Sequence, residues 1–169
     1  ATTFTGTATR ATSTAPVATG TSQRISAATG GIKNFSTANV SFELPLSAIL
    51  PDGDIVVSEL NASPDQTPSG GTPLSNKYWI VNNYGTNATF TPLLNLKINN
   101  LSGLTSPSTN YKLYRRNFNA DGATWGTTLD GGDNLASNTL TFTPAAPCVG
   151  ISSFGQFAIT DDASATPPV

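Results

Sequence analysis

The nine-residue stretch Lys77–Gly85, KYWIVNNYG, constrains most strongly what this chain can fold into. It holds three aromatic and two β-branched residues, whereas the sequence around it is mostly small and polar. Aromatic and β-branched residues are favoured in strands, and a tryptophan is large enough to anchor a core. The stretch is therefore predicted to be a central strand of the hydrophobic core.

Shorter stretches of alternating apolar and polar residues recur along the chain. In Val40–Leu46, VSFELPL, the residues Val, Phe, Leu and Leu take one face and Ser, Glu and Pro the other. Such alternation indicates a half-buried strand. Further strands are expected at Ile55–Leu60, Ala88–Asn99, Tyr111–Arg116, Asn138–Thr143 and Ile151–Thr160, and one helical turn at Ser47–Leu50. Turn clusters of Gly, Pro, Asn and Asp separate these stretches. The pattern predicts an all-β fold: a two-sheet antiparallel β-sandwich, jelly-roll-like or Ig-like, with about eight to ten short strands.

The chain of 169 residues is expected to form one domain whose first and last segments differ in composition from the rest. Residues 1–31 form an Ala/Thr-rich strand segment, residues 32–161 the sandwich, and residues 162–169 a tail that ends in prolines.

The segment 1–31 is a candidate for assembly between copies of the chain. It contains no acidic residue and little apolar bulk, so we expect it to be ordered only when its backbone pairs with a sheet. A donated strand could complete the sheet of a neighbouring copy, and head-to-tail exchange of that kind builds open filaments. The residues expected to make this contact are Thr3, Phe4, Thr5, Thr7 and Thr9. Pairing of these residues within their own domain would weaken the prediction.

A second hypothesis is a carbohydrate-binding or adhesion module with a polysaccharide partner. Exposed aromatic side chains could stack on sugar rings, and the candidates are Tyr78, Tyr84 and Trp125. Alternation places Tyr78 and Trp79 on opposite faces of their strand, so one of the two is expected to be exposed. The alternative for each candidate is packing in the core, where Tyr and Trp dominate small domains.

A third hypothesis, a small hydrolase, has little support in the residue types present. The chain has no histidine, which excludes Ser-His-Asp triads and histidine metal sites. Its ten carboxylates show no spacing that favours one acid–base pair. The chain is therefore expected not to be an enzyme.

One segment resembles the beginning of a calcium-binding loop. Asn117, Asn119 and Asp121 precede a glycine at alternate positions, as oxygen ligands do in such loops. Asp130 and Asp133 could add ligands from the following residues. The alternative is a solvated Asn/Asp/Gly turn. Apart from this Ca²⁺ candidate, no cofactor is expected.

Charge and hydropathy exclude several partners. A formal net charge of −2 and a pI near 4.8 argue against nucleic acid or an anionic membrane surface. No stretch approaches the roughly 20 apolar residues of a transmembrane helix. The first residues, Ala-Thr-Thr-Phe, suit an exported chain whose signal peptide has been removed. Cys148 is the one cysteine, either a buried small hydrophobe or an intermolecular thiol.

Between Val40 and Asp161 the order of four stretches is similar to that of a known class of modules. These stretches are KYWIVNNYG, YKLYRR, NADGATWG and ISSFGQFAIT. They resemble the β-sandwich modules of secreted and cell-surface proteins of Bacteroidetes. The resemblance implies a secreted, cell-surface or matrix protein whose module is not catalytic, and it assigns no site residue. With the strand-prone N-terminal segment, it makes a self-assembling extracellular structural protein the preferred hypothesis.

Overall fold

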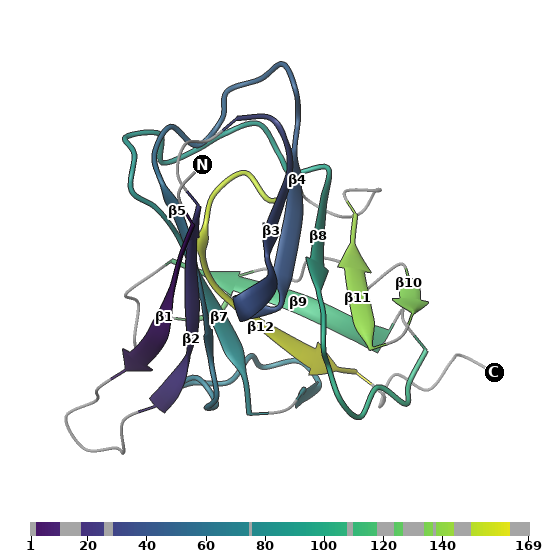
Figure 1. Cartoon of the computed structure of the whole chain (residues 1–169). Coiled ribbons are helices and arrows are strands. Elements are labelled where there is room, and N and C mark those ends of the chain that lie inside the picture. Colours follow the sequence, from purple (N-terminus) through teal and green to yellow (C-terminus); the bar gives the residue numbers. More distant parts are fainter. Residues whose placement is uncertain are drawn as a thin grey trace.

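The computed structural model describes residues 3–10, 18–25, 29–74, 76–107, 110–117, 124–126, 134–136, 138–143 and 150–162; for 3–10, 18–19 and 134–136 it describes the backbone only. Two antiparallel sheets pack face to face, so the predicted all-β sandwich is confirmed (Figure 1). The larger sheet contains β1 (Thr3–Arg10), β2 (Ala18–Ile25), β5 (Ile55–Leu60), β6 (Thr72–Pro73), β7 (Tyr78–Asn83), β9 (Tyr111–Arg116) and β12 (Gly155–Asp161). The smaller sheet contains β3 (Gly31–Phe35), β4 (Val40–Leu44), β8 (Asn95–Ile98), β10 (Asn134–Ala136) and β11 (Thr139–Phe142). A short 3₁₀ helix, η1 (Ser36–Ala38), links β3 to β4.

β7 lies inside the larger sheet, as the stretch KYWIVNNYG predicts. The strand order runs β1-β2-β5-β7-β12, and β12 also pairs with β6 and β9. Trp79 of β7 lies opposite Glu59 of β5 on one side and Phe157 of β12 on the other. The Trp79 side chain is 1% exposed. The prediction of a central core strand is confirmed.

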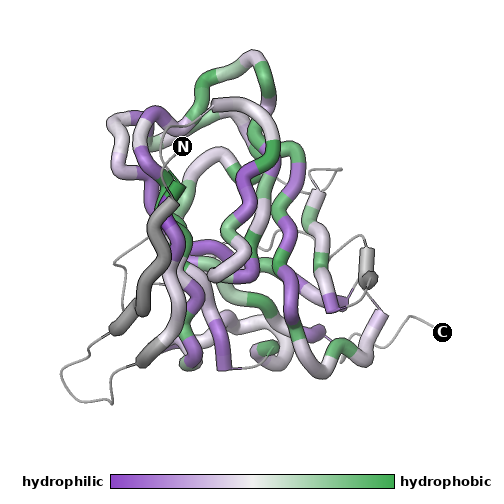
Figure 2. The backbone as a smooth tube through the Cα atoms, viewed as in Figure 1, coloured by the Kyte–Doolittle hydropathy of each residue, from purple (hydrophilic) through white to green (hydrophobic). Residues whose placement is uncertain are grey.

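The core between the sheets follows from the alternation along each strand, which Figure 2 shows as hydrophobic and hydrophilic positions in turn. In β4 the side chains of Val40, Phe42 and Leu44 are buried and the intervening ones are partly exposed. Aromatic contacts then extend the core toward one end of the sandwich. Phe42 contacts Phe154 with ring centroids 5.4 Å apart, and Phe154 contacts Phe90 at 4.6 Å. Ring pairs at such distances stabilise the core beyond the area they bury.

A second, smaller cluster lies on the outer face of the larger sheet. Leu60, Tyr78 and Ala158 are buried there, and Trp125 packs against them. The long connection between β5 and β7 covers this face, because its residue Asp65 forms an ion pair with the buried Arg116. The proline- and glycine-rich connection is therefore attached to the sheet at Asp65 and, through β6, at β12.

Two local expectations differ from the structure. The described residues contain twelve strands, more than the eight to ten expected, because β6 and β10 are too short to show an alternation pattern. The helical turn expected at Ser47–Leu50 is wrong, since Ser47 and Ala48 form a bend and Ile49 and Leu50 have no regular secondary structure. The backbone of Ile49 instead pairs with Thr91: its carbonyl accepts from the Thr91 N–H at 2.8 Å and its N–H donates to the Thr91 hydroxyl at 3.2 Å.

Candidate functional site

The residues predicted to mediate assembly lie in β1, at one edge of the larger sheet. β1 pairs with β2 of the same chain in continuous antiparallel register, from Thr3 opposite Ile25 to Arg10 opposite Ala18. Within the described part of the chain, no strand pairs with the other side of β1. β1 is therefore not an unpaired donor segment, and the form of the prediction that needed one loses support. What remains available is its outer edge.

The two sheets are joined by hydrogen bonds at β2, the strand next to β1 in the larger sheet. The Thr21 hydroxyl donates to the carbonyl of Thr37 at 2.6 Å, which joins β2 to η1 across the gap between the sheets. Gln23, which is 5% exposed, accepts from the Thr37 N–H at 2.9 Å and donates weakly to the carbonyl of Asn34 at 3.5 Å. These bonds satisfy buried polar groups on both sheets. β1 thus extends beyond the point at which the two sheets are joined (Figure 1).

The edge of β1 has few of the features by which proteins protect an open strand. Proline, charged side chains, bulges and short length are the usual protections. β1 has eight residues, TFTGTATR, with no proline and one charged residue, Arg10, at its end. Its pairing to β2 shows no bulge. Such an edge presents backbone N–H and C=O groups that another strand could pair with.

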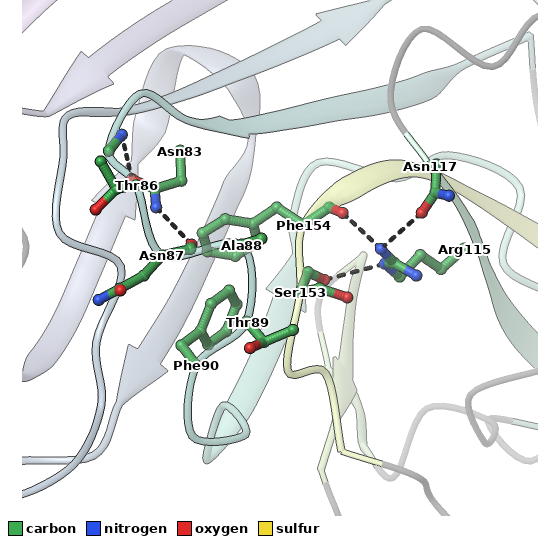
Figure 3. Close-up of a pocket in the computed structure, with 11 residues that line it drawn as sticks. Asn83, Thr86, Asn87, Ala88, Thr89, Phe90, Arg115, Asn117, Ser153 and Phe154 are labelled. Carbon is green, nitrogen blue, oxygen red and sulfur yellow. Dashed lines mark hydrogen bonds between the residues drawn. The ribbon is translucent and has the colours of Figure 1, made fainter.

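A pocket lies in the part of the same sheet that is distant from β1. It is located where β7 and β9 end and β12 begins (Figure 3). Its volume is about 500 Å³. The loop after β7 forms one wall, and the end of β9 and the residues just before β12 form the other. The lining residues are Asn83, Gly85, Thr86, Asn87, Ala88, Thr89, Phe90, Arg115, Asn117, Ser153 and Phe154.

Asp52 holds the loop wall of this pocket in place. Its carboxylate accepts hydrogen bonds from the Thr86 hydroxyl, from the Asn87 N–H at 2.8 Å and from the Thr86 N–H at 3.0 Å. These bonds hold the pKa of Asp52 far below its ordinary range. Asn87 in turn donates its side-chain amide to the carbonyl of Leu50 at 2.9 Å. The loop is therefore pre-organised by a carboxylate that stays ionised at neutral pH.

Arg115 supplies the positive charge of the pocket. Its Nε donates to the carbonyl of Ser153 at 3.0 Å, and its Nη2 donates to the carbonyl of Phe154 at 2.8 Å and to Asn117 Oδ1 at 3.3 Å. The side chain is half-buried, and this burial lowers the pKa of the guanidinium. All three acceptors are neutral, and the pocket lining contains no carboxylate. The guanidinium is therefore held rigidly without a counter-ion among the lining residues.

The three aromatic residues predicted to stack on sugars lie in different environments. Tyr78 is 0% exposed, so its assignment as a stacking residue is wrong. Tyr78 is buried with Leu60 and Ala158 in the outer cluster, against which Trp125 packs, and Trp79 is buried in the core between the sheets. Trp125 is half-buried, with the Arg116 guanidinium 4.5 Å from its ring centroid. Tyr84 is 69% exposed and lines a hollow of about 320 Å³ with Ser22, Arg24 and Val56. The three do not form a row.

The predicted calcium ligands fall mostly outside the described residues. Asn117 lines the pocket through its contact with Arg115, whereas Asn119, Asp121, Asp130 and Asp133 lie outside the described part of the chain, as does Cys148. Among the residues described, no group of three or more His, Cys, Asp or Glu side chains is placed to hold a metal ion. The calcium prediction stays a prediction.

Sequence reasoning missed Arg115. The stretch YKLYRR ends in two arginines, and strand alternation places Arg115 and Arg116 on opposite faces of the sheet. An arginine on the core-facing side of a strand needs an opening in the core, and this was the available signal. The opening itself depends on the loop after β7 and could not be read from the sequence.

Comparisons of the chain with protein-family models, with curated proteins and with solved structures found no match. Within the described residues, no helix is long and apolar enough to cross a membrane.

Proposed function

We propose that this protein is a non-catalytic, extracellular structural protein whose copies assemble into a surface filament, sheath or matrix by β-strand addition. The observation that carries the proposal is the outer edge of β1, eight residues long and located beyond the closed part of the sandwich. An open edge of this length pairs readily with another strand unless it is protected. The extracellular location is supported by the resemblance of the stretches between Val40 and Asp161 to Bacteroidetes surface modules.

Strand addition at β1 requires little from the rest of the molecule. Main-chain hydrogen bonds supply the affinity in this mode of recognition, and side chains supply the specificity. Most residues of β1, TFTGTATR, are of small types. The low net charge of −2 leaves little electrostatic repulsion between copies.

The arrangement of the larger sheet provides a route to a filament. β1 is one end of this sheet, and β9 lies at its other end, beyond β12. Pairing of β1 in one copy with β9 in the next would continue the sheet from molecule to molecule in a head-to-tail manner, which gives open chains. Pairing of β1 with β1 would give closed dimers instead.

The test is the assembly state of the full chain and of a variant in which the edge of β1 is protected by charge. Thr7→Lys introduces a lysine in the middle of β1, a natural device against edge-to-edge pairing. Thr67→Lys makes the same change on the exposed β5–β7 connection and serves as the matched control. Sedimentation velocity and electron microscopy over a range of concentrations would measure the size distribution.

We expect large polymers for the full chain and for Thr67→Lys. For Thr7→Lys we expect monomers, or assembly that begins at a concentration at least about tenfold higher. A full chain that stays monomeric at every concentration would contradict the proposal, and dimers alone would contradict the filament.

A carbohydrate-binding module is the second candidate, and it rests on the exposed Tyr84. Its ring lines the hollow beside Arg24 and Val56 on the outer face of the larger sheet. An aromatic ring next to a charged group is a suitable surface for one sugar ring. Co-sedimentation of the chain with insoluble polysaccharides tests this candidate, and equal binding by Tyr84→Ala would reject it.

A further inference from the structure

The strongest feature not used by the assembly proposal is the electrostatic state of Arg115. Its guanidinium is half-buried, and its hydrogen bonds go to two backbone carbonyls and one amide oxygen. Neutral acceptors offset the loss of hydration only in part, and a buried charge is normally paired with an opposite one. Within the described residues Arg115 has no such partner, so an anion that enters the pocket would be favoured.

The guanidinium also retains donors for a ligand. An arginine has five N–H donors in a planar arrangement that matches a carboxylate. Nε and Nη2 of Arg115 make the bonds described above, and Nη1 makes none within the described part of the chain. The orientation of the side chain is already determined, so little conformational entropy is lost when a ligand binds.

The rest of the pocket is suited to a hydroxylated ring. The Asn117 amide nitrogen and the hydroxyls of Ser153 and Thr89 make no hydrogen bond within the described residues, and all three residues line the pocket. Phe90 and Phe154 add an apolar surface on the side of the pocket away from Asn117 (Figure 3). A volume of about 500 Å³ accommodates a single sugar ring with its substituents.

We propose that this pocket binds the carboxylate of a sugar acid, with Arg115 as the carboxylate-binding residue and Asn117, Ser153 and Thr89 as partners of the ring hydroxyls. This site lies apart from β1 and does not depend on assembly. A surface protein with such a site would contact acidic polysaccharides through single uronic acid units.

The test is titration of the full chain with glucuronate, glucose and acetate, followed by NMR chemical shifts. We expect saturable shifts with glucuronate at the residues of the pocket, and at least tenfold weaker binding of glucose and of acetate. Arg115→Gln should weaken glucuronate binding at least tenfold, and Lys97→Gln, which changes an exposed cationic residue of β8 outside both pockets, should not.

Arg115→Gln also removes hydrogen bonds to the residues before β12, so its unfolding temperature is measured in parallel. Ala88→Trp provides an independent variant, because Ala88 is exposed at the pocket and a large side chain there fills the pocket without affecting Arg115. It should abolish glucuronate binding in a folded protein. Equal binding of glucose and glucuronate, equal binding of acetate and glucuronate, or unchanged binding in Ala88→Trp would each overturn the proposal.

Discussion

Arg116 shows how much a single side chain contributes to this sandwich. It is 3% exposed on the outer face of the larger sheet. Gln156 Oε1 accepts from its Nε at 3.0 Å and from its Nη2 at 2.8 Å, and Asp65 supplies the opposite charge. Trp125 covers the guanidinium and donates its own N–H to the carbonyl of Gln66 at 2.7 Å. One buried cation therefore attaches two separate connections to the sheet.

Replacement of Arg116 by Ala should lower the free energy of unfolding by about 2–3 kcal/mol. The change removes the charged donor of the Gln156 oxygen and the ion pair with Asp65. Asp65 is partly exposed, so water hydrates its carboxylate once the ion pair is removed. The expected loss of stability therefore lies near the lower end of the range for a broken buried ion pair. Urea unfolding would measure the effect.

Arg24→Ala is the control for this prediction, since Arg24 pairs with Asp54 at the surface. An exposed pair contributes less than about 1 kcal/mol. Arg116→Lys should not restore stability, because an ammonium cannot bind Gln156 through two nitrogens or stack on Trp125 in the same way. Equal stability of Arg116→Ala and Arg24→Ala would show that the Arg116 network is not structural.

At the scale of single elements, the contact between β2 and β5 depends on a glycine. Gly20 lies opposite Leu60, and a Cβ atom at Gly20 would overlap the carbonyl oxygen of Glu59 in the backbone of the neighbouring strand. Backbone atoms cannot move aside as a flexible side chain can. The absence of a side chain at this position therefore lets β2, and with it β1, approach the sheet.

Gly20→Ala should therefore destabilise the protein by about 1–3 kcal/mol, the usual cost of a steric overlap in a packed region. Urea unfolding measures the loss, and hydrogen exchange should show faster exchange in β1 and β2 than in β7. Ser22→Ala, a change on the outer face of the same strand, should stay within about 0.5 kcal/mol of the parent. If the two variants are equally stable, the close approach does not limit the sheet.

At the scale of the whole molecule, the sandwich should fold without β1, the strand whose outer edge is proposed to mediate assembly. The bonds of Thr21 and Gln23 to η1 and β3 join the two sheets at β2. β1 lies outside this closure and pairs only with β2 among the described strands. The described core residues of β4, β5, β7 and β12 contact one another.

Deletion of residues 1–13 should therefore leave a folded monomer that unfolds cooperatively. Deletion of residues 1–28 removes β2 as well. It exposes the edge of β5 and the polar groups of η1 and β3 that bond to Thr21 and Gln23, and it should abolish cooperative unfolding. Circular dichroism during heating distinguishes the two. Loss of the fold in the shorter deletion would show that β1 belongs to the structural core.

Much of the fold could be predicted from local patterns, because strand alternation depends on which residue types follow one another. The central strand in Lys77–Gly85 and the buried face of Val40–Leu44 are examples. Environments that depend on distant segments could not be predicted. Tyr78 is buried in a cluster against which the distant Trp125 packs, and nothing near Tyr78 in the sequence indicates that cover.

The sequence by itself determined that the chain is all-β, that it forms a sandwich and that KYWIVNNYG lies at its centre, since these properties follow from residue periodicity. The tertiary structure decided where β1 pairs, which arginine is neutralised and which faces a pocket. Arg115 and Arg116 are neighbours in one stretch, yet Arg116 is paired with Asp65 and Arg115 has only neutral acceptors. That difference arises because adjacent residues of a strand face opposite sides of a sheet, and different distant segments cover the two sides.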